Sequence, residues 1–425
     1  MHLKNKGQNM KITKVLAREI FDSSSNPTVE CELRLENGVS VFASVPSGKT
    51  VSPYEALELR DGGARLGGRG VLKAIEHIEL KIAPLLLGKK VSPLEMDLAL
   101  IDLDGTVNKS NLGANATLAV SMALYKAQAL IEGLELYELI ALVSGADTVT
   151  VPLPMFSLIG SSDHVRNKLA LLEIMVVPIG APNFRIAFEM GIMLQHELKK
   201  SFNKYNKTVL TGIKGSYAPL DTNEREALDI LMEALYKTTA CYGHKSIIAI
   251  DAEASRWYHA DNKAYFLHNT YKTSKELVAW YTQLVADYPI FALEDGLDQN
   301  DLEGWHCLTD SFENKIQIIG DDLFATNPYR IADGIKQHIA DTVIIKPSQL
   351  GTITETLQTI VLCKNQDITT MVSSRSAETG DSFIADLAVG TSVHQIKAGG
   401  CSHAENLAKY NRLLSIEDSL TINLL

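Results

Sequence analysis

Apolar and polar residues alternate in the first part of the chain, from Lys11 onward. Three such segments, ITKVLAREIFD, PTVECELRLENG and VSVFASVP, are separated by turn signals at Pro27 and at Asn37-Gly38. A period of two is typical of strands, and an Asn-Gly pair favours a tight hairpin. The pattern therefore predicts a three-stranded antiparallel meander.

Helical periodicity follows the meander. The segments from Leu72 to about Leu87 and from Asn115 to about Glu132 repeat their apolar residues with a helical period, and the second is rich in Ala and Leu. We expect these helices to complete, with the meander, an N-terminal α+β domain over residues 11–145.

The pattern changes beyond Val151 to short apolar runs separated by amphipathic segments. Fully buried parallel strands have this appearance. The runs are LALLEIMVVP, KTVLTGI, SIIAID, IFALED, IQIIGDD, DTVIIK, TTMVSSR and TSVHQIK. Their number and spacing suit an eightfold barrel of about 250 residues. The chain is thus predicted to be an α/β protein with a C-terminal TIM barrel over residues 146–425.

Composition and charge limit the classes of molecule that the protein is expected to bind. Hydrophobic residues make up 46% and charged residues 21%, which is ordinary globular usage and argues against a disordered or fibrous chain. The formal net charge of -11 would repel a phosphate backbone, so we expect no nucleic-acid partner. An anionic ligand would need a divalent cation or converging Lys and Arg residues.

The chain offers no targeting or membrane signal. The start, MHLKNKGQNMK, lacks the apolar core of a signal peptide, and no stretch reaches the roughly 18 apolar residues of a spanning helix. The five cysteines show no CxxC spacing, which predicts reduced, buried thiols. We therefore expect a cytoplasmic protein without a membrane partner.

Most of the apolar runs end in, or contain, a chemically active side chain. In a parallel barrel the carboxyl ends of the strands meet on one face, so these groups are expected to converge. They are Glu173, Asp251, Glu294, Asp321, Lys346, Arg375 and Lys397.

Asp251, Glu294 and Asp321 give three hard oxygen ligands, which suits Mg²⁺. Each of them alone could instead be a polar strand terminus or a helix N-cap. Lys346, after the run ThrValIleIle, is either a general base with a depressed pKa or a structural counter-ion, and Lys397 has the same two interpretations.

For the remaining candidate site residues, the sequence pattern points less specifically to a function. Arg375 with Ser376 could hold a phosphate bidentately. His164 lies in a Gly/Ser/Asp loop and could be no more than a solvated histidine, whereas Glu173 inside an apolar run needs a partner or a role.

Long motifs then resemble one family over residues 12 to about 420. They include AREIFDSSSNPTVE, EALELRDGG, IDLDGTVNKSNLGANATLAVSMA, FALEDGLD, IGDDLFATN, IIKPSQLGTITET, SSRSAETGD and IADLAVGTSVHQIKAG. In order and in extent they resemble enolase. The resemblance implies an enolase-type barrel with ββαα(βα)6 topology and an antiparallel second strand.

The same resemblance implies an activity and its residues. The reaction would be the reversible, Mg²⁺-dependent dehydration of 2-phosphoglycerate to phosphoenolpyruvate in glycolysis, by a homodimer or homo-octamer. The implied roles are metal ligation by Asp251, Glu294, Asp321 and Thr50; catalysis by Lys346, Lys214, Glu173 and His164; and substrate binding by His164, Glu173, Ser374, Arg375, Ser376 and Lys397.

The chain departs from the family pattern on the leaving-group side. GlyIleLysGlySerTyrAlaPro stands in place of GDEGGYAP, so that Lys214 replaces an acid, and we expect it to form an ion pair with Glu173. Thr50 replaces a serine metal ligand, and Ser374 replaces a histidine near the substrate. Loss of an acid that assists the leaving group would slow dehydration by about 10²- to 10⁴-fold.

Three functions therefore remain open. The first is an enolase with reduced turnover. The second is an enolase-like enzyme with a changed reaction on a phosphorylated or phosphonylated carboxylate, resembling carboxyphosphonoenolpyruvate synthase, with Lys214 receiving an anionic group. The third is a catalytically inactive binding protein that keeps only the fold.

Overall fold

The computed structural model describes residues 10–48, 52–161, 169–212 and 214–422. The chain forms two compact units. The first comprises Met1–Thr150, Ile345–Leu362 and Ser374–Val393, and the second Val151–Ile344, Cys363–Ser373 and His394–Leu425. Two segments that follow late strands of the chain therefore pack with the N-terminal elements.

The first unit contains the predicted meander. Its strands are β1 (Ile12–Phe21), β2 (Pro27–Leu35) and β3 (Ser40–Ser44), paired antiparallel in the order β1-β2-β3. The positive φ of Gly38 gives the turn between β2 and β3 a backbone conformation that glycine adopts without strain. The prediction of a three-stranded antiparallel sheet is confirmed.

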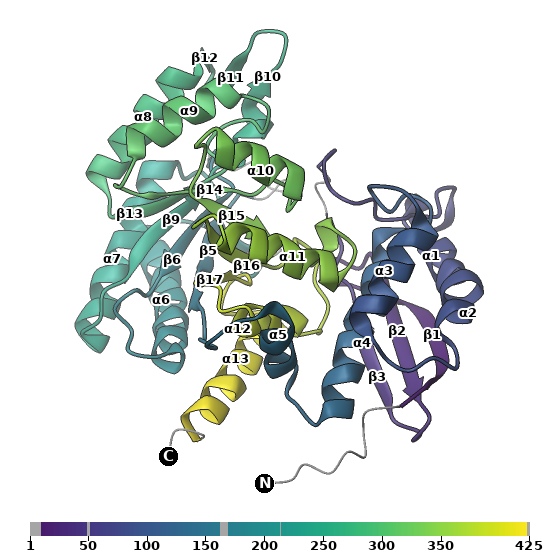
Figure 1. The fold of residues 1–425 in the computed structure, drawn as a ribbon. Coiled ribbons are helices and arrows are strands. Elements are labelled where there is room, and N and C mark those ends of the chain that lie inside the picture. Colours follow the sequence, from purple (N-terminus) through teal and green to yellow (C-terminus); the bar gives the residue numbers. More distant parts are fainter. Residues whose placement is uncertain (1–9, 49–51, 162–168, 213, 423–425) are drawn as a thin grey trace. The chain divides into compact units, whose positions relative to one another are not determined.

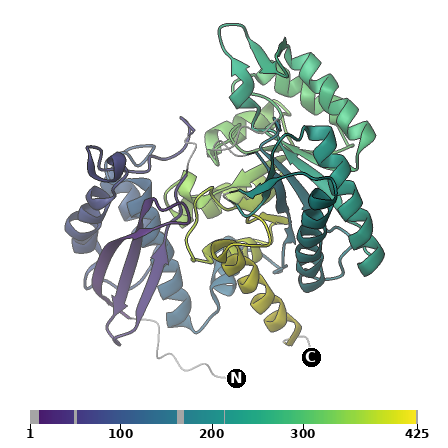
Figure 2. The same ribbon diagram turned by 180° about the vertical axis from the view of Figure 1, so that it is seen from behind.

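Helices cover one face of this sheet, which lies in front in Figure 2 and behind the helices in Figure 1. Those that contact the strands are α1 (Leu72–His77), η2 (Ile78–Ile82), α2 (Ala83–Leu86) and α4 (Ala114–Glu132). The 3-10 turn η1 (Arg65–Gly68) precedes them, and α3 (Pro93–Asp104) and α5 (Leu136–Ser144) pack on α4. The long helix α4 packs on β2 and β3 and is buried over most of its length.

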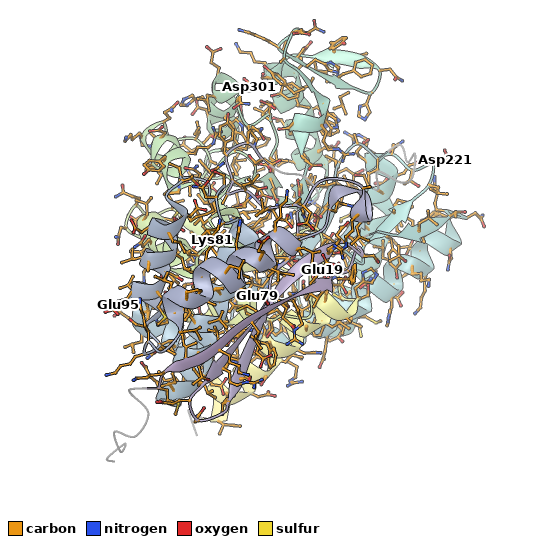
Figure 3. The ribbon with its side chains drawn as sticks, turned by 90° about the vertical axis from the view of Figure 1, so that its right-hand side faces the viewer. Glu19, Glu79, Lys81, Glu95, Asp221 and Asp301 are labelled. Atoms are coloured by element: carbon orange, nitrogen blue, oxygen red, sulfur yellow. The ribbon has the colours of Figure 1, made fainter. Side chains whose placement is uncertain are left out.

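The predicted helix from Leu72 is interrupted by the π-helical turn η2. Pro84 has no N–H group with which to continue the α-helical ladder, and the helix widens immediately before it. Ile78 and Ile82 remain buried while Glu79 and Lys81, labelled in Figure 3, are exposed. The apolar stripe is thus kept across the irregular turn.

The second unit is built around one curved sheet, with the order β4-β17-β16-β15-β14-β13-β9-β6-β5-β8-β7. Its strands are β4 (Leu153–Pro154), β5 (Phe156–Gly160), β6 (Glu173–Val177), β7 (Val209–Thr211), β8 (Tyr217–Pro219), β9 (Ile247–Asp251), β13 (Ile290–Glu294), β14 (Gln317–Gly320), β15 (Thr342–Ile345), β16 (Thr369–Ser373) and β17 (Gln395–Lys397). Only Met155 separates β4 from β5, so one chain segment pairs with both β17 and β6 and closes the barrel.

The second barrel strand runs against its neighbours, as the ββαα(βα)6 topology requires. Strand β6 pairs antiparallel with β5 and with β9, whereas β9, β13 and β14 pair parallel. The predicted enolase-type barrel is confirmed. Its interior is filled by Met155, Met175, Val177, Ile247, Ala249, Ala292, Ile319, Ile344 and Met371.

Amphipathic helices alternate with the later strands; α6, α7, α8 and α9 surround β6, β9 and β13 in Figure 1. The helices that follow the barrel strands are α6 (Phe184–Lys204), α7 (Glu224–Tyr242), α8 (Ser274–Asp287), α9 (Leu302–Phe312), α10 (Pro328–Lys336), α11 (Ile353–Lys364), α12 (Phe383–Gly390) and α13 (Ala404–Ile422). Shorter elements are η3 (Ala254–Trp257), η4 (Pro347–Gln349) and a small antiparallel sheet of β10 (Tyr258–His259), β11 (Ala264–Leu267) and β12 (Thr270–Lys272).

Two further observations bear on the sequence-based expectations. No helix in the described part of the chain is long and apolar enough to cross a membrane. The five cysteines are free thiols, of which Cys31, Cys363 and Cys401 are buried. The expectation of burial is wrong for Cys241, which is exposed near the C-terminal end of α7.

Candidate active site

Three carboxylates lie in one row across three neighbouring strands. Asp251 ends β9, and it pairs in register with Glu294, the last residue of β13. Glu173 opens β6 and also pairs with Asp251, because β6 runs in the opposite direction and begins where β9 ends. Residues opposite one another in a sheet point to the same face, so the register alone brings these three acids together.

Lys397, the last residue of β17, joins this row. Its Nζ donates to Asp251 Oδ2 at 2.9 Å and to Glu294 Oε1 and Oε2 at 2.7 and 2.8 Å. Glu173 Oε2 lies 3.6 Å from the same nitrogen. All four side chains are buried, and Glu294 is completely so. Four strands of the barrel thus contribute to one cluster.

The charges of the cluster are unequal. Burial alone would lower the pKa of Lys397, but Asp251, Glu173 and Glu294 raise it well above its usual value. Burial also raises the pKa of Glu294, with further contributions from Asp251 and Asp321 that Lys397 only partly offsets. Negative charge is therefore in excess, and a bound cation would lower the free energy of the site.

Lys214 supplies a second cation on the other side of Glu173. Its Nζ lies 2.6 Å from Glu173 Oε1, so the expected ion pair is confirmed. Burial would raise the pKa of Glu173, but Lys214 and Lys397 together lower it to about 2. Glu173 is consequently ionised at neutral pH and cannot donate a proton there.

Asp321 follows β14 and is held in place by Asp295. The backbone N–H groups of Asp321 and Asp322 donate to Asp295 Oδ1 and Oδ2 at 3.0 and 2.8 Å. Oxygen atoms of these three residues lie within 4.8 Å of one another. Asp295 therefore orients the loop that carries the expected ligand Asp321.

The predicted ligands have the donor chemistry that Mg²⁺ prefers, but the acids whose oxygens lie within 4.8 Å of one another in the described residues are Asp295, Asp321 and Asp322. Asp251, Glu294 and Asp321 provide hard carboxylate oxygens from consecutive strand ends, and the charge of Asp321 acts on both Lys397 and Glu294.

The remaining described candidates belong to the first unit. Lys346 directly follows β15, and Ser374, Arg375 and Ser376 follow β16. Both terminal nitrogens of Arg375 donate to Glu55, at 2.6 and 3.1 Å, and the two side chains are buried. Gly48 lies against this guanidinium, since a Cβ built there would come within 1.8 Å of Nη2.

His164 and Thr50 lie outside the described residues. Sequence reasoning missed Asp295 and Glu55. Asp295 could have been found as a second acid directly after the strand-end Glu294, whereas Glu55 is 320 residues from Arg375 and gave no local signal.

Comparison with known proteins gives the family. The model described as "Enolase, N-terminal domain" matches residues 12–140, and "Enolase, C-terminal TIM barrel domain" matches residues 148–424. The chain is 44% identical over 412 residues to a protein named "Enolase" from Natranaerobius thermophilus, covering 96% of this chain and 95% of that relative. The two matched domains span nearly the whole sequence, and the chain belongs to the enolase family.

Proposed function

We propose that the barrel site catalyses the reversible, Mg²⁺-dependent dehydration of 2-phosphoglycerate to phosphoenolpyruvate. The observation that carries this proposal is the buried row of Glu173, Asp251 and Glu294 around Lys397. The proposed domains are residues 11–145 and 146–425. The ligand is a small phosphorylated carboxylate, and the family suggests a cytoplasmic homodimer or homo-octamer acting in glycolysis.

In this proposal Asp251, Glu294 and Asp321 hold one Mg²⁺, and Thr50 contributes to a second. When bound, the ions stabilise the negative charge that develops on the substrate carboxylate as C2 loses its proton. Lys346 removes that proton. Lys397, fixed by three hydrogen bonds to two carboxylates, presents a permanent positive charge to the same developing anion.

Arg375 and Ser376 hold the phosphate, and the family resemblance assigns substrate binding to His164 and Ser374 as well. The ion pair with Glu55 fixes the plane of the Arg375 guanidinium, but it engages both terminal nitrogens, so a phosphate would share these donors with the Glu55 carboxylate.

The leaving-group step falls to Lys214. The electron pair left at C2 forms the C2=C3 double bond, the C3–O bond breaks, and the hydroxyl takes a proton from the Lys214 ammonium and leaves as water. Glu173 cannot supply this proton, since its pKa of about 2 keeps it ionised. It holds Lys214 at 2.6 Å and so fixes the donor.

The Lys214–Glu173 pair also favours a second candidate function. An ammonium at this position could receive an anionic nucleophile or leaving group, as in a reaction resembling that of carboxyphosphonoenolpyruvate synthase. The two candidates share C2 proton removal and differ in what leaves or attacks beside Lys214.

One assay separates them: formation of phosphoenolpyruvate from 2-phosphoglycerate with Mg²⁺, alongside exchange of the C2 proton in D₂O. For the proposed function we expect activity in the natural chain and a loss of about 10²- to 10⁴-fold in Lys214→Met, as for removal of a general acid. Lys200→Met, at a lysine whose side chain is 68% exposed, is the matched control.

The other outcomes are equally informative. Exchange without dehydration, with dehydration appearing only in Lys214→Glu, would favour the changed reaction. Absence of both activities in the presence of Mg²⁺ would overturn the proposal.

A further inference from the structure

The loop that carries Lys214 is hydrogen-bonded to the loop that follows Lys397, and we call this contact the loop junction. Lys214 lies between β7 and β8, and Lys397 ends β17. The backbone N–H of Gly400 donates to the carbonyl oxygen of Lys214 at 2.8 Å. The backbones beside the two lysines of the site are therefore in direct contact.

Asn406, in the first turn of α13, strengthens this junction. Its Nδ2 donates to the carbonyl oxygens of Lys214 at 2.9 Å, Ser402 at 2.9 Å and Gly400 at 3.3 Å. The side chain is only 4% exposed. An aspartate at this position would place an ionised carboxylate, which has no hydrogen to donate, against three carbonyl oxygens. The contact therefore requires the amide side chain of asparagine.

Close packing leaves the junction little room to shift. Gly399, with φ of 84°, lies so near that an added Cβ would come within 2.5 Å of Asn406 Nδ2. Gly215, with φ of 78°, would likewise place a Cβ 2.7 Å from Ser402 Oγ. Glycine at these two left-handed positions leaves room for Asn406 and for Ser402, respectively.

Helix α6 holds the same loop from another side. Gln195 Nε2 donates to the carbonyl oxygen of Gly215 at 2.9 Å, and Ser402 Oγ donates to that oxygen at 3.1 Å. Two consecutive carbonyl groups, of Lys214 and Gly215, are thus bound by side chains from α6 and from the start of α13.

We propose that Asn406 is a positioning residue for Lys214: by binding the Lys214 carbonyl oxygen it fixes the ammonium against Glu173 and relative to Lys397. Its effect on turnover rests on the function proposed above for Lys214, but the positioning itself does not.

The first test measures positioning without catalysis. Reductive methylation of the folded protein is followed by peptide mass spectrometry, and the rate at Lys214 is divided by the rate at exposed Lys200. In Asn406→Asp we expect a relative rate at Lys214 about fivefold higher, the change that loss of one net hydrogen bond would give. Asn411→Asp, at an exposed position of the same helix, should leave the ratio unchanged.

An unchanged ratio in folded Asn406→Asp overturns the proposal. Should circular dichroism show that this variant does not fold, Asn406→Leu and Ser402→Ala take its place. Ser402→Ala removes one hydroxyl donor to Gly215, and an unchanged ratio in both of these folded replacements is equally decisive against the proposal.

The second test connects positioning to chemistry. Asn406→Asp should slow dehydration at least about tenfold, which corresponds to about 1.4 kcal/mol of barrier, while C2 proton exchange changes less than twofold. In a Lys214→Met background the Asn406 substitution should have no further effect on dehydration.

Equal losses of exchange and dehydration, or additive losses in the double variant, would show a general structural role and contradict the proposal. A natural chain without lyase activity but with the expected labelling change would refute the proposed function and leave the positioning role intact.

Discussion

At the scale of single residues, Lys397 is the centre of the described site. It is buried among three carboxylates that come from β6, β9 and β13, and it is the partner of Glu294, which is fully buried. Removing one partner of a buried ion pair leaves uncompensated charge in a low-dielectric environment. The stability of the barrel and the charge of the site therefore depend on the same ammonium.

We expect Lys397→Met to lower the free energy of unfolding by about 3–5 kcal/mol in the absence of Mg²⁺. Urea unfolding at pH 7 measures this change. Lys200→Met, which removes an exposed lysine of α6, should change it by less than about 0.5 kcal/mol. Equal effects of the two substitutions would show that the cluster does not stabilise the fold.

At the scale of elements, Asp97 joins three helices of the first unit. It lies on α3, and its Oδ2 accepts hydrogen bonds from Ser121 Oγ of α4 and from the N–H and hydroxyl of Thr354 at the start of α11. Its Oδ1 has no hydrogen-bond partner. Burial outweighs these hydrogen bonds and raises the pKa of Asp97 from 3.8 to about 6.

This shift gives stability a defined pH dependence. Because the native state binds the proton more tightly than the unfolded state, the contribution of Asp97 to stability falls as the pH rises from about 4 to about 6. A rise of about two units in the pKa of Asp97 corresponds to roughly 3 kcal/mol of stability. This stability is lost completely once the pH is above about 6, where Asp97 is ionised in the native state.

The free energy of unfolding of Asp97→Asn should therefore rise by about 3 kcal/mol relative to that of the natural chain as the pH increases from 4 to 7. Urea unfolding across this range, with the exposed Asp102→Asn on the same helix as control, tests the expectation. Parallel pH profiles for Asp97→Asn and the natural chain would show that Asp97 does not titrate in this window.

The described elements were largely predictable because their signals are local. The buried strands at β9, β13, β14 and β15 are continuous apolar runs, and each is followed or ended by the polar residue that we singled out. The π-helical turn before Pro84 was not expected, because one proline inside an otherwise periodic helix can be accommodated in several ways.

At the scale of the whole molecule, the formal charge of -11 and the excess of buried carboxylates favour a divalent cation. A ligand that binds only the native state raises the free energy of unfolding, by about 2.7 kcal/mol at a concentration 100 times its Kd. We therefore expect Mg²⁺ to stabilise the natural protein against heat.

Calorimetry with and without Mg²⁺ should show this stabilisation in the natural chain and its loss in Asp321→Asn. Glu95→Gln, at the exposed acid on α3 labelled in Figure 3, should retain it. Stabilisation of Asp321→Asn equal to that of the natural chain would mean that the ion binds elsewhere.

The sequence by itself determined the meander, most of the barrel strands and the acids and lysines at their ends, because hydrophobic periodicity and strand termini are properties of neighbouring residues. The prediction was wrong for KTVLTGI, which forms the partly exposed strand β7, antiparallel to β8, and not a buried parallel strand. Only the tertiary structure decided which groups meet. Lys397 reaches Asp251 across 146 positions of sequence, and Asn406 reaches Lys214 across 192. Those contacts follow from strand register and barrel closure, which bring together residues that share no local pattern.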